Sequence, residues 1–324
     1  MRSLLLKRMR LLRSSWKTFG AGVVVIALFG IAALALSFSF GSSRPTSFSP
    51  TANVLHVVAA ENFWGSLVAQ IGGSHVQVTS IVTDPNVDPH TYESNAQTAR
   101  AFANADYVVL NGAGYDSWGE KLLGGNPSSH RVVLDVATLL GKKQGDNPHF
   151  WYDPAYVNQV ASRMEHDLIA LDPSNASYYE QQYQALRSAL LPYQNRIVSI
   201  RQHFAGTNVA ATEDIFSYFA SAAGLNLISP TAFMQAIAEG NDPPSASVVL
   251  FQNQLASRQP AVLVYNQQTI TPLTARMKKL ATTEGISVVG VTETIQPPSA
   301  SFQDWMNAQV LALQTALAAS APGK

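Results

Sequence analysis

The chain is 324 residues long, enough for two domains of ordinary size, and 47% of its residues are hydrophobic. Its 21 basic and 21 acidic residues give no net charge, and the body of the chain has no basic stripe, so neither nucleic-acid binding nor capture of an acidic partner is expected. Cysteine is absent, which excludes disulfides, thiolate metal ligands, cysteine nucleophiles and lipid attachment to a cysteine.

Residues 1–40 predict an export signal or membrane anchor. Residues 2–17 carry several basic residues and no acidic residue, and residues 19–40 contain no charge. An uncharged stretch of about 20 residues can span a bilayer, whereas a cleaved signal usually has about 7–15. The length therefore favours an anchor that is not cleaved, with the basic flank in the cytoplasm and the rest of the chain outside. Residues 41–52 are rich in Ser, Thr and Pro and predict a flexible linker.

The remaining chain predicts an α/β fold with two lobes, each built on a mostly parallel sheet with flanking helices. Short apolar runs rich in β-branched residues alternate with longer amphipathic stretches, as in parallel α/β domains. The expected N-terminal lobe is residues 53–173, and the expected C-terminal lobe is residues 206–319. The predicted strands are residues 54–60, 76–82, 106–110 and 131–136 in the first lobe, and 208–212, 261–265 and 287–292 in the second.

Residues 174–205 predict a single long helix between the lobes. Apolar residues recur three and four positions apart from Ala176 to Phe204. Pro192 lies inside this stretch, and a proline in a helix interior costs about 3 kcal/mol and removes one hydrogen bond. We therefore expect a kink or a local break there, in a helix that stiffens the relative orientation of the two lobes.

Two similar motifs, DPHTYE at residues 88–93 and NPHFWYDP at residues 147–154, each place a histidine directly after a proline. Proline fixes its own φ and disfavours helix in the residue before it, so His90 and His149 are expected to project from ordered turns. One such histidine alone is more often a surface or capped residue than a ligand. Two of them, together with acids at strand ends, indicate two halves of a metal site.

Polar residues that follow the predicted strands complete the candidate site. In open α/β sheets, ligands bind beyond the carboxyl ends of the strands, and Glu213, Asn266 and Glu293 follow three of them. Two imidazoles and two carboxylates would neutralise a divalent cation, and this donor set suits Zn²⁺, Mn²⁺ or Fe²⁺. Simpler roles stay open, because Glu213 also suits the start of a helix and Glu293 also suits a solvated loop.

Other residues near the motifs are expected to support the site. Asp88, Glu93 and Asn266 are interpreted as hydrogen-bond partners of the ligands, since a ligating histidine usually donates its second ring N–H to an oxygen. Asp153 before Pro154 has the pattern of a helix N-cap. The remaining histidines lack a partner pattern and are interpreted as structural; they are His56, His75, His130, His166 and His203.

Three parts of the chain together resemble the solute-binding proteins of zinc and manganese ABC transporters. They are VVAAENFWGSLVAQIGG at residues 57–73, the two proline–histidine motifs, and ISVVGVTE at residues 286–293. The resemblance implies two α/β lobes joined by a long helix, with one divalent metal ion carried between them as cargo. It implies that the ligands are His90 and His149 from the first lobe and Glu213 and Glu293 from the second.

The sequence departs from the family pattern in ways that bear on the metal. Zinc-selective members often have a histidine-rich loop between the first two ligands, whereas this interval holds only His130. Glutamate at position 213 resembles the manganese branch, yet Glu293 replaces the aspartate common there. Asn266 stands where some members have an acid. Both zinc and manganese therefore remain open.

We expect an extracytoplasmic solute-binding component that is not an enzyme. It would deliver its ion to an ABC transporter permease, attach to the membrane through its N-terminal segment, and act as a monomer without nucleic acid. One alternative is a metal-dependent hydrolase with three protein ligands, an activated water, and Asp88 or Glu93 as the base. Another is a surface adhesin in which the metal is structural. A Gly-rich phosphate loop, a nucleophile elbow and an HExxH helix are all absent from the sequence.

Overall fold

The computed structural model describes residues 54–86 and 92–320 of the chain. The predicted anchor and linker, and the ligand candidate His90 together with Asp88, lie outside these ranges. Within them, no helix is both long and apolar enough to cross a bilayer.

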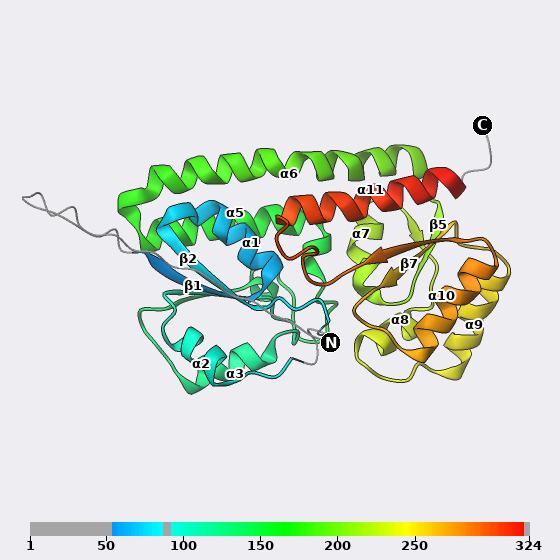
Figure 1. Ribbon diagram of the computed structural model, residues 1–324, viewed down its shortest axis with the longest axis horizontal. Coiled ribbons are helices and arrows are strands. Elements are labelled where there is room, and N and C mark those ends of the chain that lie inside the picture. Colours follow the sequence, from blue (N-terminus) through cyan, green and yellow to red (C-terminus); the bar gives the residue numbers. More distant parts are fainter. Residues whose placement is uncertain (1–53, 87–91, 321–324) are drawn as a thin grey trace, which may run out of the picture. The chain divides into compact units, whose positions relative to one another are not determined.

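The strands of the described residues form two parallel four-stranded sheets, one in each lobe (Figure 1). The first has the order β2-β1-β3-β4 and contains β1 (Leu55–Glu61), β2 (Val76–Val82), β3 (Tyr107–Leu110) and β4 (Val132–Asp135). The second has the order β6-β5-β7-β8 and contains β5 (Asn208–Ala211), β6 (Asn226–Leu227), β7 (Val262–Asn266) and β8 (Ser287–Val291). The predicted α/β class is confirmed, although the sequence pattern did not predict the two-residue strand β6.

Helices connect the parallel strands within each lobe. In the N-terminal lobe they are α1 (Asn62–Gly72), α2 (Ala96–Ala103), α3 (Ser117–Gly125), α4 (Val136–Leu139) and α5 (Pro154–Leu171). In the C-terminal lobe they are α7 (Ser217–Ala222), α8 (Thr231–Ala238), α9 (Ser245–Ala256), α10 (Pro272–Thr283) and α11 (Phe302–Ser320). The predicted cap of α5 is confirmed, because the Asp153 carboxylate accepts a hydrogen bond from the backbone N–H of Ala155 at 2.8 Å.

The central strands β1, β3 and β7 are buried almost throughout because both faces of each sheet are covered at its centre. Successive side chains of a strand point to opposite faces. Thus Val57 and Ala59 of β1 pack in the largest buried cluster, and Val58 and Ala60 pack in a smaller one with Phe102. The second sheet divides in the same way. One face of each sheet contributes to the largest cluster, so a single apolar core runs through both lobes.

The long helix α6 (Ala176–Phe204) joins the lobes, as predicted, and lies beside α1, α5 and α11 (Figure 1). Its buried side chains follow the three- and four-residue spacing read from the sequence: Tyr179, Leu186, Leu190, Tyr193, Ile197 and Ile200. At its start α11 also contacts α1, where the amides of Gln70 and Gln303 donate to each other at 3.1 and 2.8 Å. Two helices therefore hold the lobes together along the same side.

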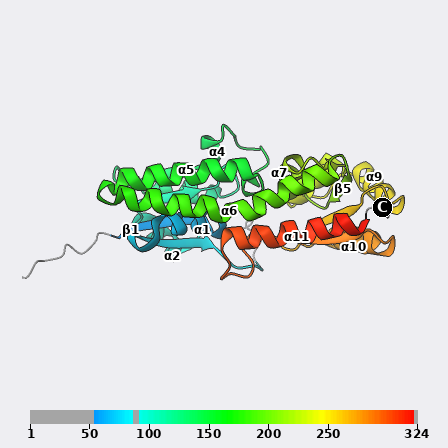
Figure 2. The same cartoon turned by 90° about the horizontal axis from the view of Figure 1, so that it is seen from above.

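Pro192 does not break α6, which is helical on both sides of the proline. Figure 2 shows instead that the helix changes direction near its middle, in line with the expected kink. Just before the proline, the Ser188 hydroxyl donates to the carbonyl oxygen of Gln184 at 3.0 Å, a contact that also favours bending. Tertiary packing of the flanking Leu190 and Tyr193, both buried, offsets the lost hydrogen bond.

The neighbouring residues Leu190 and Leu191 test how far the core depends on α6. Leu190 is 0% exposed, and Leu190→Ala should lower the free energy of unfolding by about 2–5 kcal/mol because it leaves a cavity. Leu191 is 50% exposed, and the matched Leu191→Ala change should stay within about 0.5 kcal/mol. Denaturant unfolding measures the free energy of unfolding of both variants. Equal decreases would show that α6 is not packed as described.

Candidate metal centre

His149 lies at the end of a short turn that the Asn147 side chain stabilises. The Asn147 Oδ1 atom accepts a hydrogen bond from the backbone N–H of His149 at 2.9 Å and lies 2.8 Å from its Nδ1. Asn147 Nδ2 donates to the carbonyl oxygen of Asp214 at 2.7 Å, which fixes the amide with Oδ1 toward the imidazole. The prediction that His149 projects from an ordered turn is confirmed.

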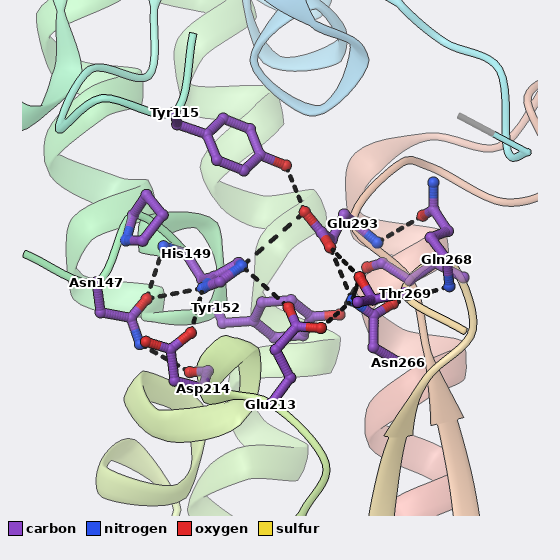
Figure 3. Close-up of polar contacts among 12 residues, drawn as sticks. Tyr115, Asn147, His149, Tyr152, Glu213, Asp214, Asn266, Gln268, Thr269 and Glu293 are labelled. Atoms are coloured by element: carbon purple, nitrogen blue, oxygen red, sulfur yellow. Dashed lines mark hydrogen bonds and ion pairs between the residues drawn. The ribbon is translucent and has the colours of Figure 1, made fainter. Parts of the chain in front are cut away.

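The same contacts determine the tautomer of His149. Nδ1 faces two oxygen atoms, Asn147 Oδ1 at 2.8 Å and Asp214 Oδ1 at 3.3 Å, so the ring proton belongs on Nδ1. Nε2 then presents its lone pair, as a metal-ligating imidazole must. This atom points toward the C-terminal lobe (Figure 3).

Glu213 and Glu293 lie at the carboxyl edge of the second sheet. Each is the second residue after a strand: Glu213 after β5 and Glu293 after β8. Both carboxylates are 0% exposed. Glu213 Oε1 lies 3.6 Å from His149 Nε2, and Glu293 Oε2 lies 3.9 Å from the same atom. The structure therefore brings together three of the predicted ligands, from both lobes.

Burial of two carboxylates side by side is costly, and a divalent cation would compensate it. One imidazole nitrogen and two carboxylate oxygens suit Zn²⁺, Mn²⁺ or Fe²⁺, and no thiolate is present to favour a soft metal. These donor atoms lie on a common side of His149, so the arrangement fits a bound ion. The simpler expectation of a solvated loop for Glu293 is wrong, because the residue is buried.

Asp214 forms a second possible donor group with His149 and Glu213, whose ligand atoms lie within 4.8 Å of one another. Its carboxylate faces Nδ1 of His149 and not Nε2. Since Nδ1 carries the proton in the tautomer that Asn147 imposes, Asp214 orients the imidazole instead of sharing a metal with it.

Two tyrosines of the N-terminal lobe reach the loop that holds Glu293. The Tyr115 hydroxyl donates to Glu293 Oε2 at 2.7 Å. The Tyr152 hydroxyl contacts the carbonyl oxygen of Thr292 at 2.8 Å and Gln309 Oε1 at 2.9 Å. Burial, and then the negative charge of Glu293, raise the pKa of Tyr152, so this hydroxyl stays protonated and able to donate.

A buried acid supports the loop that carries Tyr115. The Asp116 carboxylate accepts hydrogen bonds from the backbone N–H groups of Asn111 at 2.6 Å and Gly112 at 2.9 Å. Gly112 has a φ of 75°, which glycine adopts without strain. Asn111 in turn donates to the carbonyl oxygen of Pro148 at 2.9 Å, so this loop contacts the segment on which His149 lies.

Asp116 is close to a second buried acid, Glu61, at the end of β1. Burial raises the pKa of Asp116 to about 7 despite the two backbone hydrogen bonds that lower it. Burial, the charge of Asp116 and a hydrogen bond to it raise the pKa of Glu61 well above its ordinary value. The two carboxyl groups therefore hold protons in the folded state at a pH where they are ionised in the unfolded chain.

Comparison with known proteins agrees with this geometry. Residues 57–316 match the family described as zinc-uptake complex component A, periplasmic (ZnuA). The chain belongs to this family. The family resemblance read from the sequence is confirmed, and the match covers the strands and helices of both lobes.

Individual relatives are distant in sequence. The metal ABC transporter substrate-binding lipoprotein FimA of Streptococcus parasanguinis is 25% identical over 265 residues, covering 77% of this chain and 83% of the relative. The manganese ABC transporter substrate-binding lipoprotein PsaA of Streptococcus pneumoniae is 24% identical over 266 residues, with 77% and 83% covered. The periplasmic zinc binding protein TroA of Treponema pallidum has the same fold, with a TM-score of 0.69, 17% identity, and coverage of 83% and 100%.

The other predicted supporting residues have different outcomes. Asn266 lies at the site, where its amide contacts both glutamates. Glu93 is exposed, and no described contact links it to the three ligands. The sequence did not predict the contacts of Tyr115, Asp214 or Gln268, whose Oε1 atom accepts a hydrogen bond from the backbone N–H of Glu293 at 2.7 Å. The only sequence sign of them was position, since Asp214 follows Glu213 directly and Gln268 lies two residues after Asn266.

The Glu61–Asp116 pair predicts a pH-dependent stability. Groups whose pKa is higher in the folded state stabilise the fold fully below their unfolded pKa, here 3.8 for aspartate, and lose this contribution as the pH rises to about 7. Glu61→Gln replaces an ionisable carboxyl group beside Asp116 by a neutral amide, which carries no charge at any pH. Relative to the unmodified chain, this variant should therefore be increasingly stabilised as the pH rises between those values.

Denaturant unfolding at a series of pH values measures this difference. Glu120→Gln, the same change at an exposed position of α3, should follow the unmodified chain at every pH. A Glu61→Gln variant whose unfolding free energy runs parallel to that of the unmodified chain would show that the buried pair does not hold its protons as described.

Proposed function

We propose that this chain is the extracytoplasmic solute-binding component of a metal ABC transporter. It binds one divalent transition metal ion, zinc or manganese, between its two lobes and delivers the ion to the membrane permease. The convergence of His149, Glu213 and Glu293 from both lobes on one point carries the proposal. Membership of the ZnuA family supports it, as do the names of the relatives, which describe transporter components that bind metals.

We assign His90 as the fourth ligand. The DPHTYE motif has the same proline–histidine pattern as the motif of His149, whose imidazole the structure places beside both carboxylates. Two neutral imidazoles and two carboxylates would give a bound divalent ion no net charge, which lowers the cost of holding it away from water.

The ion would reach the site through a pocket of roughly 290 Å³ beside His149. Tyr115 and Asn147 line it from one lobe and Asp214 from the other, and Asp146 and Glu239 add negative charge. Such a lining attracts cations. A larger pocket of about 1200 Å³ lies at the amino ends of β5 and β7, away from the three ligands.

Release of the ion requires that the carboxylates move away from His149. Several hydrogen bonds between the lobes oppose this, including Tyr115 to Glu293 at 2.7 Å, Asn147 to Asp214 at 2.7 Å, and Ile295 to Asn62 at 3.0 Å. The shared core and α6 limit the movement to a small one. We propose that contact with the permease separates these hydrogen-bonded groups.

We further propose a tether without lipid. The relatives are named lipoproteins, whereas this chain has no cysteine to carry a lipid. Residues 1–40 would anchor the protein, residues 41–52 would act as a linker, and residues 53–173 and 206–319 would form the lobes on either side of residues 174–205. The protein would act as a monomer, without nucleic acid.

The hydrolase alternative loses support from the family assignment, because the relatives are solute-binding components of transporters. The adhesin alternative gains no support from the described residues, in which the buried side chains of His149, Glu213 and Glu293 face one another. A transport role therefore explains the geometry without a catalytic base or a partner-binding surface.

Substitution of the histidines tests the ligand assignment. His149→Ala and His90→Ala should each weaken binding of Zn²⁺ and Mn²⁺ by at least about 100-fold, because loss of a direct ligand should cost no less than the loss of its supporting partner. His166→Ala is the matched control, since that imidazole is 71% exposed on α5, and it should leave affinity unchanged.

Competition with a chromophoric chelator measures these affinities in the full-length chain in detergent. Retention of affinity in His149→Ala would contradict the proposed function. Retention in His90→Ala alone would contradict only the assignment of the fourth ligand.

A further inference from the structure

Asn266 lies between the two glutamates because of the strand order of the second sheet. β7 runs between β5 and β8, and Asn266 is its last residue. Glu213 and Glu293 follow the two flanking strands, so their carboxylates lie on either side of the amide (Figure 3). Asn266 is only 1% exposed, so its polar atoms must be satisfied within the protein.

The amide of Asn266 contacts both carboxylates. Its Nδ2 atom donates to Glu293 Oε1 at 2.7 Å and to Glu213 Oε2 at 2.9 Å. A primary amide has two hydrogens, so each of these two short contacts can use one. Thr269 Oγ1 lies close to the same nitrogen, at 3.0 Å.

The orientation of the amide is fixed from its other end. Asn266 Oδ1 accepts a hydrogen bond from the backbone N–H of Gln268 at 3.0 Å. The reverse orientation would place the carbonyl oxygen against two carboxylates and the NH₂ group against an N–H donor. The hydrogen-bond network therefore allows one orientation only.

The two oxygens of each carboxylate have different contacts. Glu213 Oε2 and Glu293 Oε1 are held by Asn266, while Glu213 Oε1 and Glu293 Oε2 face His149 Nε2 at 3.6 and 3.9 Å. A carboxylate held in this way presents a single oxygen to an ion. Each oxygen keeps a lone pair beside its hydrogen bond, as Glu293 Oε2 does, which also accepts from the Tyr115 hydroxyl at 2.7 Å. The amide therefore acts by orienting the carboxylate, which would have to turn before both of its oxygens faced one ion.

We infer that Asn266 is a positioning residue that sets the metal preference toward zinc over manganese, an inference that rests on the proposed function. Two single oxygens, His149 Nε2 and the imidazole of His90, which the proposed function assigns as the fourth ligand, would provide four donor atoms, which is the number that zinc takes in closed sites. Manganese favours oxygen-rich, six-coordinate surroundings. By holding the second oxygen of each glutamate toward its own NH₂ group, Asn266 disfavours the manganese arrangement more than the zinc one.

Two substitutions of Asn266 separate this role from one of charge alone. Asn266→Ala removes the amide and leaves both carboxylates able to bind with two oxygens. Asn266→Asp removes the donors as well and adds a further oxygen and a negative charge. Asn253→Asp makes the same change of charge at an exposed position on α9 of the same lobe and serves as the control.

The measured quantity is the ratio of the dissociation constants for Mn²⁺ and Zn²⁺, in the full-length chain in detergent. Both Asn266 variants should lower this ratio by at least about tenfold, the size of effect expected when a partner of a metal ligand is removed. The Asn253→Asp variant should keep the ratio of the unmodified chain. An unchanged ratio in Asn266→Ala would overturn the inference, and a change in Asn266→Asp alone would overturn it in favour of a charge effect.

Co²⁺ absorption tests the same inference through the coordination number of the bound ion. Four-coordinate Co²⁺ has intense visible bands, whereas six-coordinate Co²⁺ has weak ones. The unmodified chain loaded with Co²⁺ should give intense bands, and both Asn266 variants should give weaker ones. Weak bands in the unmodified chain would contradict this role of Asn266 while leaving the proposed function intact, whereas failure of the unmodified chain to bind any of the three ions would overturn the proposed function itself.

Discussion

Two carboxylates are buried close together at the carboxyl edge of the second sheet. Glu213 and Glu293 are both inaccessible to solvent, and the parallel arrangement of β5, β7 and β8 places them on either side of Asn266. Negative charge held away from water is unfavourable unless something of opposite sign or a strong donor compensates it. The donors in contact with the pair come from both lobes, as Asn266 and Tyr115 show. The site is therefore complete only when the lobes are together.

The two lobes are held together by a hydrophobic core that they share, and not by a flexible hinge alone. One buried cluster contains the inner faces of both sheets and residues of α6 and α11. Its largest side chains include Trp64, Trp151 and Trp305, which are almost inaccessible to solvent. Such a core is closely packed and has a low compressibility. Small changes in the hydrogen bonds between the lobes are therefore the natural means by which a site of this kind opens.

Much of this arrangement could be predicted from the sequence, because local patterns determine it. Apolar runs of strand length predicted seven of the eight described strands, and the spacing of apolar residues predicted α6. The two-residue β6 has too few residues to show a pattern. The chemistry at strand ends was predictable for a similar reason, since the carboxyl edge of a parallel sheet is where ligands bind.

The supporting residues of the site could not be predicted, because their contacts depend on how the lobes pack. Tyr115 meets Glu293 although 178 positions separate them in the chain. Asp214 lies beside His149 Nδ1 because of the approach of the two lobes. The prediction that Asn266 is a hydrogen-bond partner of the ligands placed it correctly at the site. Its contact with both carboxylates depends on strand order, which sequence alone does not give.

We propose that one divalent ion binds between the lobes at His149, Glu213 and Glu293. An X-ray crystal structure of the zinc-loaded protein, with data collected on both sides of the zinc absorption edge, would locate the ion. The proposed site requires one strong anomalous peak at bonding distance from His149 Nε2 and from one oxygen of each glutamate. A zinc peak elsewhere, or none at all in crystals grown with excess zinc, would contradict it.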